Sequence, residues 1–112
     1  MDVSRDDYLD VNDALKRIGG NLDLYKKLLK RFIDGNDFEA LVKALDSGDA
    51  EESKRLAHTI KGVSANLSLK RIRAASTELE LILKDNLNHA PILTELKEAY
   101  EITIKLIVEF TA

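Results

Sequence analysis

Apolar residues recur every three to four positions along most of the chain, and strand-like alternation of apolar and polar residues is nearly absent. This spacing is that of amphipathic helices, so the pattern predicts an all-helical protein. Glycine-containing breaks at 19–20, 35–36 and 47–48 separate the helices of the first half. We expect six helices, covering approximately residues 11–18, 22–34, 38–47, 49–67, 69–85 and 91–110.

Several residues at the expected helix ends have side chains suited to those places. Asn21 is a good N-cap, and Asp49 followed by Glu52 has the spacing of a capping box. Pro91 suits the first turn of the last helix. In the second helix the expected apolar stripe is Leu24, Tyr25, Leu28, Leu29 and Phe32.

Four longer amphipathic helices joined by short turns favour an antiparallel up-down four-helix bundle. One or two short N-terminal helices would pack across one end of this bundle, and the candidates are the first two helices. We expect residues 1–112 to form one domain, because this length supports one hydrophobic core. The acidic residues Asp6, Asp7 and Asp10 are interpreted as a solvated, partly frayed end.

Composition excludes several classes of protein. The chain is 45% hydrophobic and 33% charged, and it has no cysteine, so it holds no disulfide and no cysteine-based metal site. No apolar run approaches the roughly 20 residues that span a membrane, and the polar N-terminus does not resemble a signal peptide. The net charge of −3 offers no general attraction to nucleic acid or anionic lipid. We expect a cytoplasmic monomer.

His58 is placed on the solvent side of the expected fourth helix. At 100° per residue, the core stripe Leu56, Ile60, Val63 and Leu67 falls within about 40° of the side opposite His58. The face that carries the imidazole also holds the cations Lys54, Arg55 and Lys61, together with Glu51, Gly62, Ala65 and Leu69.

Gly62 is unusual inside such a strong helical pattern. Glycine there costs about 1 kcal/mol relative to alanine. Gly62 lies one turn after His58 on the exposed face, where close packing of helices cannot explain the glycine. The missing side chain leaves the imidazole open to another molecule. An exposed imidazole is a nucleophile when neutral, and the nearby cations can pair with an added phosphoryl group.

The segment from Ala57 to Leu67, AHTIKGVSANL, resembles the histidine-containing phosphotransfer family, whose hallmark is His-x-x-Lys-Gly on a bundle helix. The Ser-x-Asn that follows at Ser64 to Asn66, and the turn at Gly48-Asp49, extend the similarity. One departure is Ser68, where the family often has glycine. Serine can cap the next helix, so we expect only a small change in the turn.

The resemblance implies a phosphoryl carrier rather than a conventional enzyme. His58 would accept a phosphoryl group from the aspartate of a response-regulator receiver domain and pass it to another receiver. Lys61 would neutralise phosphoryl oxygens, and Gly62 would let the receiver approach. The docking surface would include Lys54, Arg55, Ala65 and Leu69. No cofactor is expected in this chain, since Mg²⁺ would belong to the receiver, and a hybrid sensor kinase is a further possible partner.

Two other interpretations stay open. The same motif occurs in the phosphoacceptor domains of chemotaxis histidine kinases, but no glycine-rich ATP loop is present, and Ser64-Ala65-Asn66 favours the phosphorelay type. A plain helical interaction module would make His58 incidental. A di-metal bundle is discarded, because Arg55 and Asn86 stand where Glu-x-x-His pairs with His58 and His89 would need glutamate. His89 is interpreted as a loop residue without a role.

Overall fold

The computed structural model describes residues 4–112, and over this range the chain forms seven α-helices and no strand. This confirms the all-helical prediction. The helices are α1 (Arg5–Tyr8), α2 (Val11–Arg17), α3 (Leu22–Asp34), α4 (Asp37–Ser47), α5 (Ala50–Asn66), α6 (Lys70–Lys84) and α7 (Ala90–Thr111).

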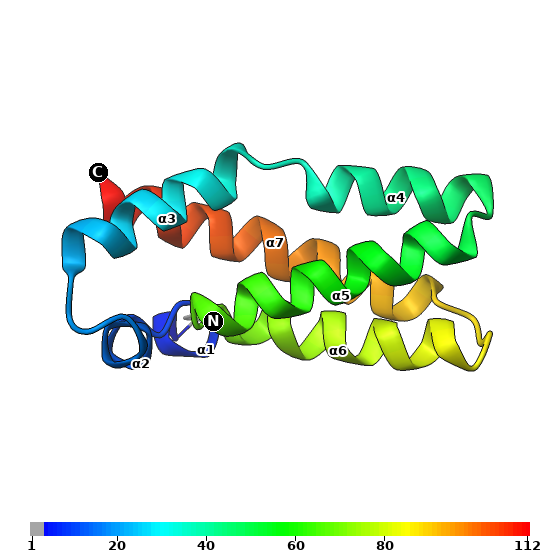
Figure 1. Ribbon diagram of the computed structural model, residues 1–112, viewed down its shortest axis with the longest axis horizontal. Helices are drawn as coiled ribbons and strands as arrows, with labels where there is room; N and C mark the ends of the chain where they lie inside the picture. The colour runs from blue at the N-terminus through cyan, green and yellow to red at the C-terminus, as the bar shows by residue number, and fades with distance from the viewer. Residues whose placement is uncertain (1–3) are drawn as a thin grey trace.

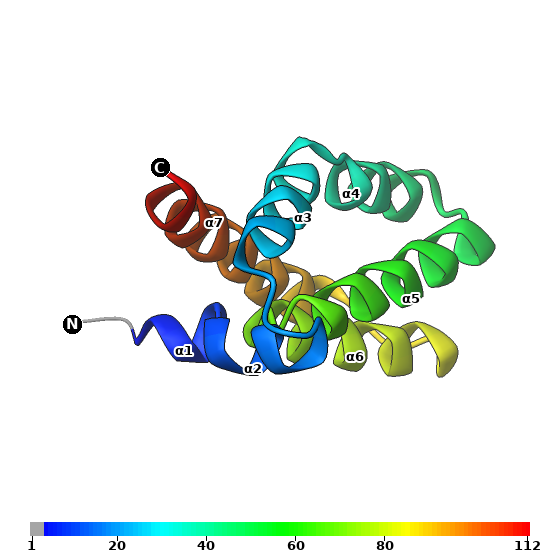
Figure 2. The same ribbon diagram turned by 60° about the vertical axis from the view of Figure 1, so that its left-hand side comes forward.

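Helices α4 to α7 run up and down beside one another, as predicted (Figure 1). Helix α5 packs on α4 and α6, and α6 packs on α7. Helix α3 was expected to lie across one end, but it continues the direction of α4 and packs along α7. The short helices at the end of the bundle are α1 and α2, which lie on the opposite side of the molecule from α3 and α4 (Figure 2).

Local capping explains where α4 ends and where α5 begins. Gly48 adopts a left-handed conformation (φ 74°) and ends α4 by donating its N–H to the carbonyls of Ala44 and Leu45. Asp49 then caps α5 by accepting from the N–H of Glu52. The capping box is only half formed, because the Glu52 carboxylate pairs with Arg55 instead of returning to Asp49.

The core is built mainly from leucine, isoleucine and alanine. Leu56 and Ile60 of α5 are buried as predicted, together with Leu29, Leu41, Ile72, Leu79, Leu96 and Ile107 from the other helices. Leu24 was predicted to join the core, but it is 41% exposed because the buried side of α3 is centred on Tyr25 and Leu29. Within residues 4–112 no helix combines the length and apolar character that a membrane span requires.

The N-terminal acidic segment is more structured than the sequence suggested. Asp6 and Asp7 are exposed, but in α1, and Asp10 is not frayed. Asp10 caps α2 by accepting from the N–H of Asp13, and its carboxylate lies 2.6 Å from Lys70 Nζ. Its own N–H donates to the carbonyl of Ser68. Asp10 therefore fastens the N-terminal segment to the turn between α5 and α6.

We predict that Asp10→Asn lowers stability near pH 7, because asparagine keeps the cap but loses the ion pair. Hydrogen bonds from Lys70 and from the Asp13 N–H lower the pKa of Asp10. A lowered carboxyl pKa stabilises the fold above the unfolded value of about 3.9, and this contribution is lost as the pH falls through the folded value. The melting temperatures of wild type and Asp10→Asn, measured between pH 7 and pH 3, should therefore converge in acid. A difference in melting temperature that stays the same at every pH would show that the ion pair is not its cause.

Thr103 supplies a second stability prediction. Its hydroxyl, fully buried on α7, is the one buried side-chain polar atom without a hydrogen-bond partner in the part of the chain that the structure describes. An unsatisfied buried hydroxyl costs about 1–3 kcal/mol. Thr103→Val keeps the shape and should raise the free energy of unfolding by about 1 kcal/mol in urea titration. Thr103→Ser, which keeps the hydroxyl and loses a methyl group, should lower it. A destabilised valine variant would show that the hydroxyl is satisfied.

Candidate functional site

His58 lies in the middle of α5 and points away from the core. Its neighbours Leu56 and Ile60 are 3% and 1% exposed, whereas the imidazole side chain is 71% exposed. The helical periodicity that buries the apolar stripe is therefore what places this ring in solvent. The orientation matches the one expected from the sequence.

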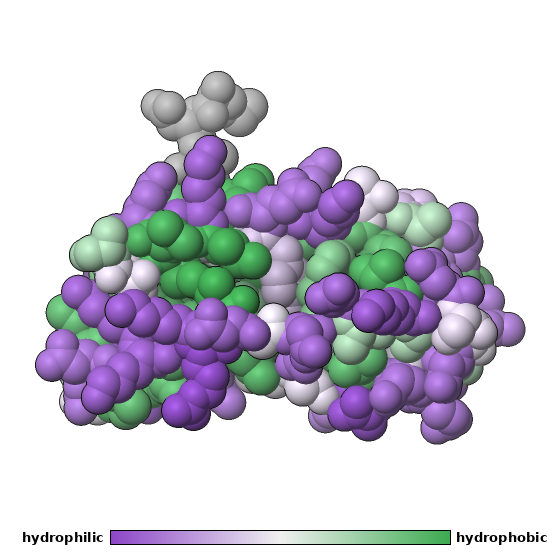
Figure 3. All heavy atoms as spheres, turned by 90° about the horizontal axis from the view of Figure 1, so that it is seen from above, coloured by the Kyte–Doolittle hydropathy of each residue, from purple (hydrophilic) through white to green (hydrophobic). Residues whose placement is uncertain are grey.

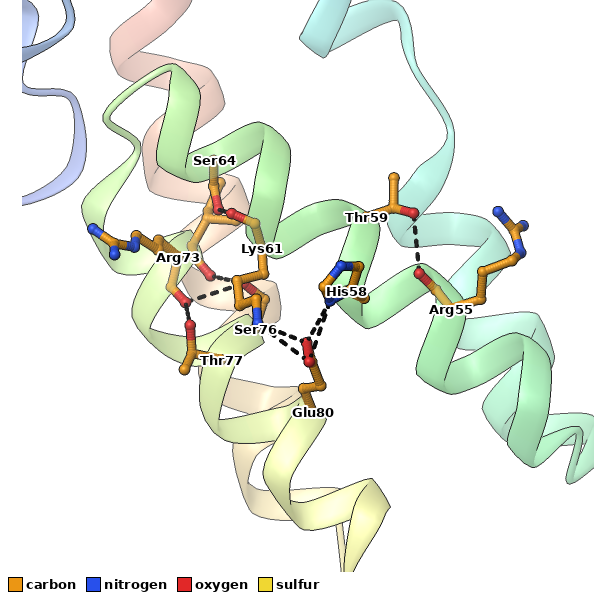
Figure 4. Close-up of polar contacts among 10 residues, drawn as sticks. Arg55, His58, Thr59, Lys61, Ser64, Arg73, Ser76, Thr77 and Glu80 are labelled. Carbon is orange, nitrogen blue, oxygen red and sulfur yellow. Dashed lines mark hydrogen bonds and ion pairs between the residues drawn. The ribbon is translucent and has the colours of Figure 1, made fainter. Parts of the chain in front are cut away.

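Glu80 of α6 reaches across to the same place. Its two carboxylate oxygens lie 3.2 and 3.3 Å from His58 Nδ1, and 3.1 and 3.2 Å from Lys61 Nζ. One carboxylate thus bridges the histidine and the lysine that follows it by one turn (Figure 4). The second ring nitrogen of His58 points away from Glu80.

This contact decides which nitrogen of His58 is available. Partial burial raises the pKa of the Glu80 carboxyl, but hydrogen bonds from Lys61 and His58 outweigh burial and leave this pKa below its usual value. Glu80 is therefore ionised at neutral pH and can only accept hydrogen bonds. His58 must donate from Nδ1, so the neutral ring carries its lone pair on Nε2, on the side open to solvent.

Lys61 and Gly62 occupy the positions around the ring that the helix geometry predicts. Lys61 is half-buried against α6 and is held by Glu80. Gly62 is exposed, and a Cβ built on it would meet no atom within 4 Å. No neighbour requires glycine at this position, and the surface beside His58 is open there.

A shallow depression of about 450 Å³ surrounds His58. Its walls come from α5 and α6, and besides the hydroxyl of Thr59 they combine cations with carboxylates: Glu51, Lys54, Arg55, Glu80 and Lys84. Arg55 is already paired with Glu52, whereas Lys54 and Lys84 have no ion pair among the described residues. The surface beside the imidazole therefore holds two cations without an ion pair, Lys54 and Lys84, and the carboxylate Glu51, which is also without one among the described residues.

Two expectations about the end of α5 are wrong. Leu69 is fully buried, so it cannot belong to a docking surface. The prediction placed Leu69 by continuing the helix of His58 as far as residue 69. The helix does not continue there, because Ser68 adopts a left-handed conformation (φ 55°) and turns the chain inward. Ser68 does not cap α6 either, since its hydroxyl donates to Asp13 at 2.6 Å. Ala65 is half-buried on the predicted face.

A larger apolar hollow of about 690 Å³ lies where the α3–α4 junction meets α5 and α7. Phe32, Phe38 and Tyr100 line it, and the Tyr100 ring lies 5.5 Å from that of Phe32 and 4.7 Å from that of Phe38. Hydrophobic surface shows on the α3–α4 side of the molecule (Figure 3). The hollow shares no residue with the depression around His58, so it is separate from the candidate site.

Sequence reasoning missed Glu80 and Lys84. Both lie on α6, more than 20 positions from His58 in the sequence, and only the register of α6 against α5 brings them to the imidazole. Their spacing of four residues places them on one face of α6, which is the only signal that the sequence offers. That signal is common on solvated helices and does not by itself indicate a site.

Comparison with known protein families gives a match over most of the chain. The profile of the family described as "Hpt domain" matches residues 27–105, from within α3 to within α7, and this range includes His58, Lys61, Gly62 and Glu80. None of the curated proteins or solved structures that were compared matches the chain. Hpt domains act in phosphotransfer during two-component signalling and interact with receiver domains and kinases. Because the match covers more than half of the sequence, the chain belongs to the Hpt domain family, the histidine-containing phosphotransfer domains.

Proposed function

We propose that this protein is a phosphorelay intermediate. His58 accepts a phosphoryl group from the aspartyl phosphate of one receiver domain and passes it to the aspartate of another. The observation that carries this proposal is the exposed imidazole whose Nδ1 is held by Glu80, which leaves Nε2 free to react. The protein has no kinase activity of its own in this scheme.

Acceptance is one displacement at phosphorus. A bond forms between His58 Nε2 and the phosphorus while the bond from phosphorus to the aspartyl oxygen breaks, and the aspartate leaves as a carboxylate. The proton on Nδ1 stays where it is, hydrogen-bonded to Glu80, so the phosphorylated ring is an imidazolium. Donation is the reverse, and a protonated Nδ1 lets the ring leave as neutral imidazole.

Charge and space around the ring have complementary roles. Lys61 lies one turn from His58 and neutralises phosphoryl oxygens, while Lys54, Arg55 and Lys84 attract the acidic site of a receiver. We expect Gly62 and Ala65, which have no long side chain, to form part of the docking surface. Mg²⁺ is expected to come with the receiver, and no cofactor is assigned to this chain.

The test is incubation with a receiver domain phosphorylated on its aspartate, followed by intact-mass analysis. The expected product is one phosphoryl group on this protein that is labile in acid and stable in base, as phosphohistidine is. A second, unphosphorylated receiver should then remove it. Loading by an ATP-bound kinase domain but by no receiver would indicate the phosphoacceptor domain of a kinase instead. No loading even by phosphoramidate, a small phosphoryl donor, would support the plain interaction module.

A further inference from the structure

We propose that the apolar hollow beside the α3–α4 junction is a second binding site, for a small, neutral molecule with fused flat rings and one oxygen that accepts a hydrogen bond from Tyr100. The hollow shares no residue with the depression around His58. The inference therefore goes beyond the proposed phosphoryl transfer and does not depend on it.

The hollow arises because the helical bundle is open along one side. Helix α4 packs on α5, and α3 packs on α7, whereas α4 and α7 make only sparse contact with each other. Gly35 and Asn36, which join α3 to α4, lie at this opening, and the hollow has a volume of about 690 Å³. Small-molecule sites have volumes of roughly 300–1,000 Å³ and often lie between the helices of bundles. The hollow is therefore large enough for a molecule of two or more fused rings.

Aromatic side chains give the hollow a flat apolar wall. The ring of Tyr100 lies 5.5 Å from that of Phe32, and the planes of these two rings differ by 18°. The ring of Phe38 lies 4.7 Å from that of Tyr100. Aliphatic side chains from α3, α5 and α7 also line the hollow, among them Leu28, Val63 and Ile104. A planar ring system that packs against this wall removes apolar surface of both partners from water.

The Tyr100 hydroxyl is the polar group that selects one kind of ligand. Tyr100 is only 9% exposed, yet its hydroxyl has no hydrogen-bond partner among residues 4–112. The other buried tyrosine, Tyr25, donates its hydroxyl to the carbonyl of Leu67 at 2.7 Å. The Tyr100 hydroxyl is not fully enclosed as that of Thr103 is, because Tyr100 lines the hollow. An oxygen atom of a ligand in the hollow would supply the acceptor that the protein does not.

Charges around the hollow favour a neutral ligand. Burial, and to a smaller extent the Asp37 carboxylate, raises the pKa of Tyr100, so its hydroxyl stays protonated and can donate at neutral pH. The hollow is also lined by three carboxylates and two cations, none of which forms an ion pair among the described residues: Asp37, Glu39, Glu101, Arg31 and Lys97. The excess of negative charge disfavours an anion, and the presence of both signs leaves no strong attraction for a cation.

The experiment titrates the whole protein with three probes that share one ring system: 2-naphthol, naphthalene and 2-naphthoate. Proton–nitrogen-15 NMR measures the binding and shows where on the molecule each probe lies. We expect 2-naphthol to bind at one saturable site, with shift changes centred on the hollow, and to bind more tightly than the anion 2-naphthoate. Absence of saturable binding, or shift changes centred elsewhere, would overturn the inference. Changes at the hollow that a receiver domain causes and no probe causes would assign it to a protein partner and overturn the inference as well.

Tyr100→Phe tests the hydroxyl alone. The variant keeps the ring and has no hydrogen bond to lose within the protein, so a urea titration should show a fold as stable as wild type. It should weaken the binding of 2-naphthol about fivefold, which corresponds to about 1 kcal/mol, and leave the binding of naphthalene unchanged. Tyr8→Phe is the matched control, because Tyr8 lines a different depression, and it should bind both probes as wild type does. Equal binding of 2-naphthol by wild type and Tyr100→Phe would overturn the inference.

A second pair of variants tests the hollow itself. Ile104→Trp places a large side chain in the hollow, which has room for it, and should weaken the binding of 2-naphthol and naphthalene at least about tenfold. Val108→Trp makes the same kind of change one turn later on α7, where Val108 is 54% exposed and does not line the hollow. This variant should bind both probes as wild type does. Undiminished binding by Ile104→Trp would place the probes elsewhere and overturn the inference.

Discussion

His58→Gln is expected to abolish phosphoryl acceptance from receivers and from phosphoramidate while leaving the fold unchanged. The side chain is 71% exposed, and it contacts Glu80 without filling any part of the core. Glutamine is a good helix former, so the free energy of unfolding should change by less than about 0.5 kcal/mol. Intact mass after loading and a urea titration would measure the two effects separately.

The chain provides a matched control in its other histidine, His89. This residue is half-buried at the N-cap of α7, and its side chain makes no capping hydrogen bond. His89→Gln should load as wild type does. Retained loading in His58→Gln would remove His58 as the acceptor, and loss of loading in His89→Gln would contradict the interpretation of His89 as a residue without a role. A large drop in the stability of His58→Gln would show that the imidazole has a structural role.

The parts of the structure that the sequence predicts well are those governed by local interactions. Asn21 caps α3 by accepting from Leu24 N–H, and Gly48 and Asp49 end one helix and begin the next. The exposure of His58 follows from the same local rule, because the residues on the opposite side of one helix are apolar. These predictions need no knowledge of how helices pack against one another.

The errors arise where packing between segments decides the outcome. Glu80 reaches His58 through the register of two helices, which no periodicity specifies. Leu69 was assigned to the exposed face by extending a helix beyond Ser68, where the backbone turns. Asp10 appeared to belong to a frayed end because its partner, Lys70, lies 60 positions away. Charged side chains carry little information about their partners when those partners are distant in sequence.

Gly62→Gln is expected to stabilise the isolated protein and to block transfer from receivers. Glycine inside an exposed helix costs up to about 1 kcal/mol relative to a good helix former, and a Cβ at this position meets no atom within 4 Å. The free energy of unfolding should therefore rise by about 0.5–1 kcal/mol. Side chains in a helix lean toward its N-terminus, so glutamine at this position would extend over the turn that carries His58.

The size of the partner distinguishes this steric effect from a chemical one. Transfer from a receiver should fall by about 100-fold or more, which corresponds to about 2.7 kcal/mol in the transition state, because the receiver must approach the whole face. Loading by phosphoramidate should change far less, since a small donor reaches Nε2 past one flexible side chain. Gly62→Ala is the matched variant: it gains the same helix propensity with a single methyl group, and it should keep most of its receiver transfer. Destabilisation of both variants would contradict the open surface at Gly62, and normal receiver transfer in Gly62→Gln would place the docking surface elsewhere on the molecule.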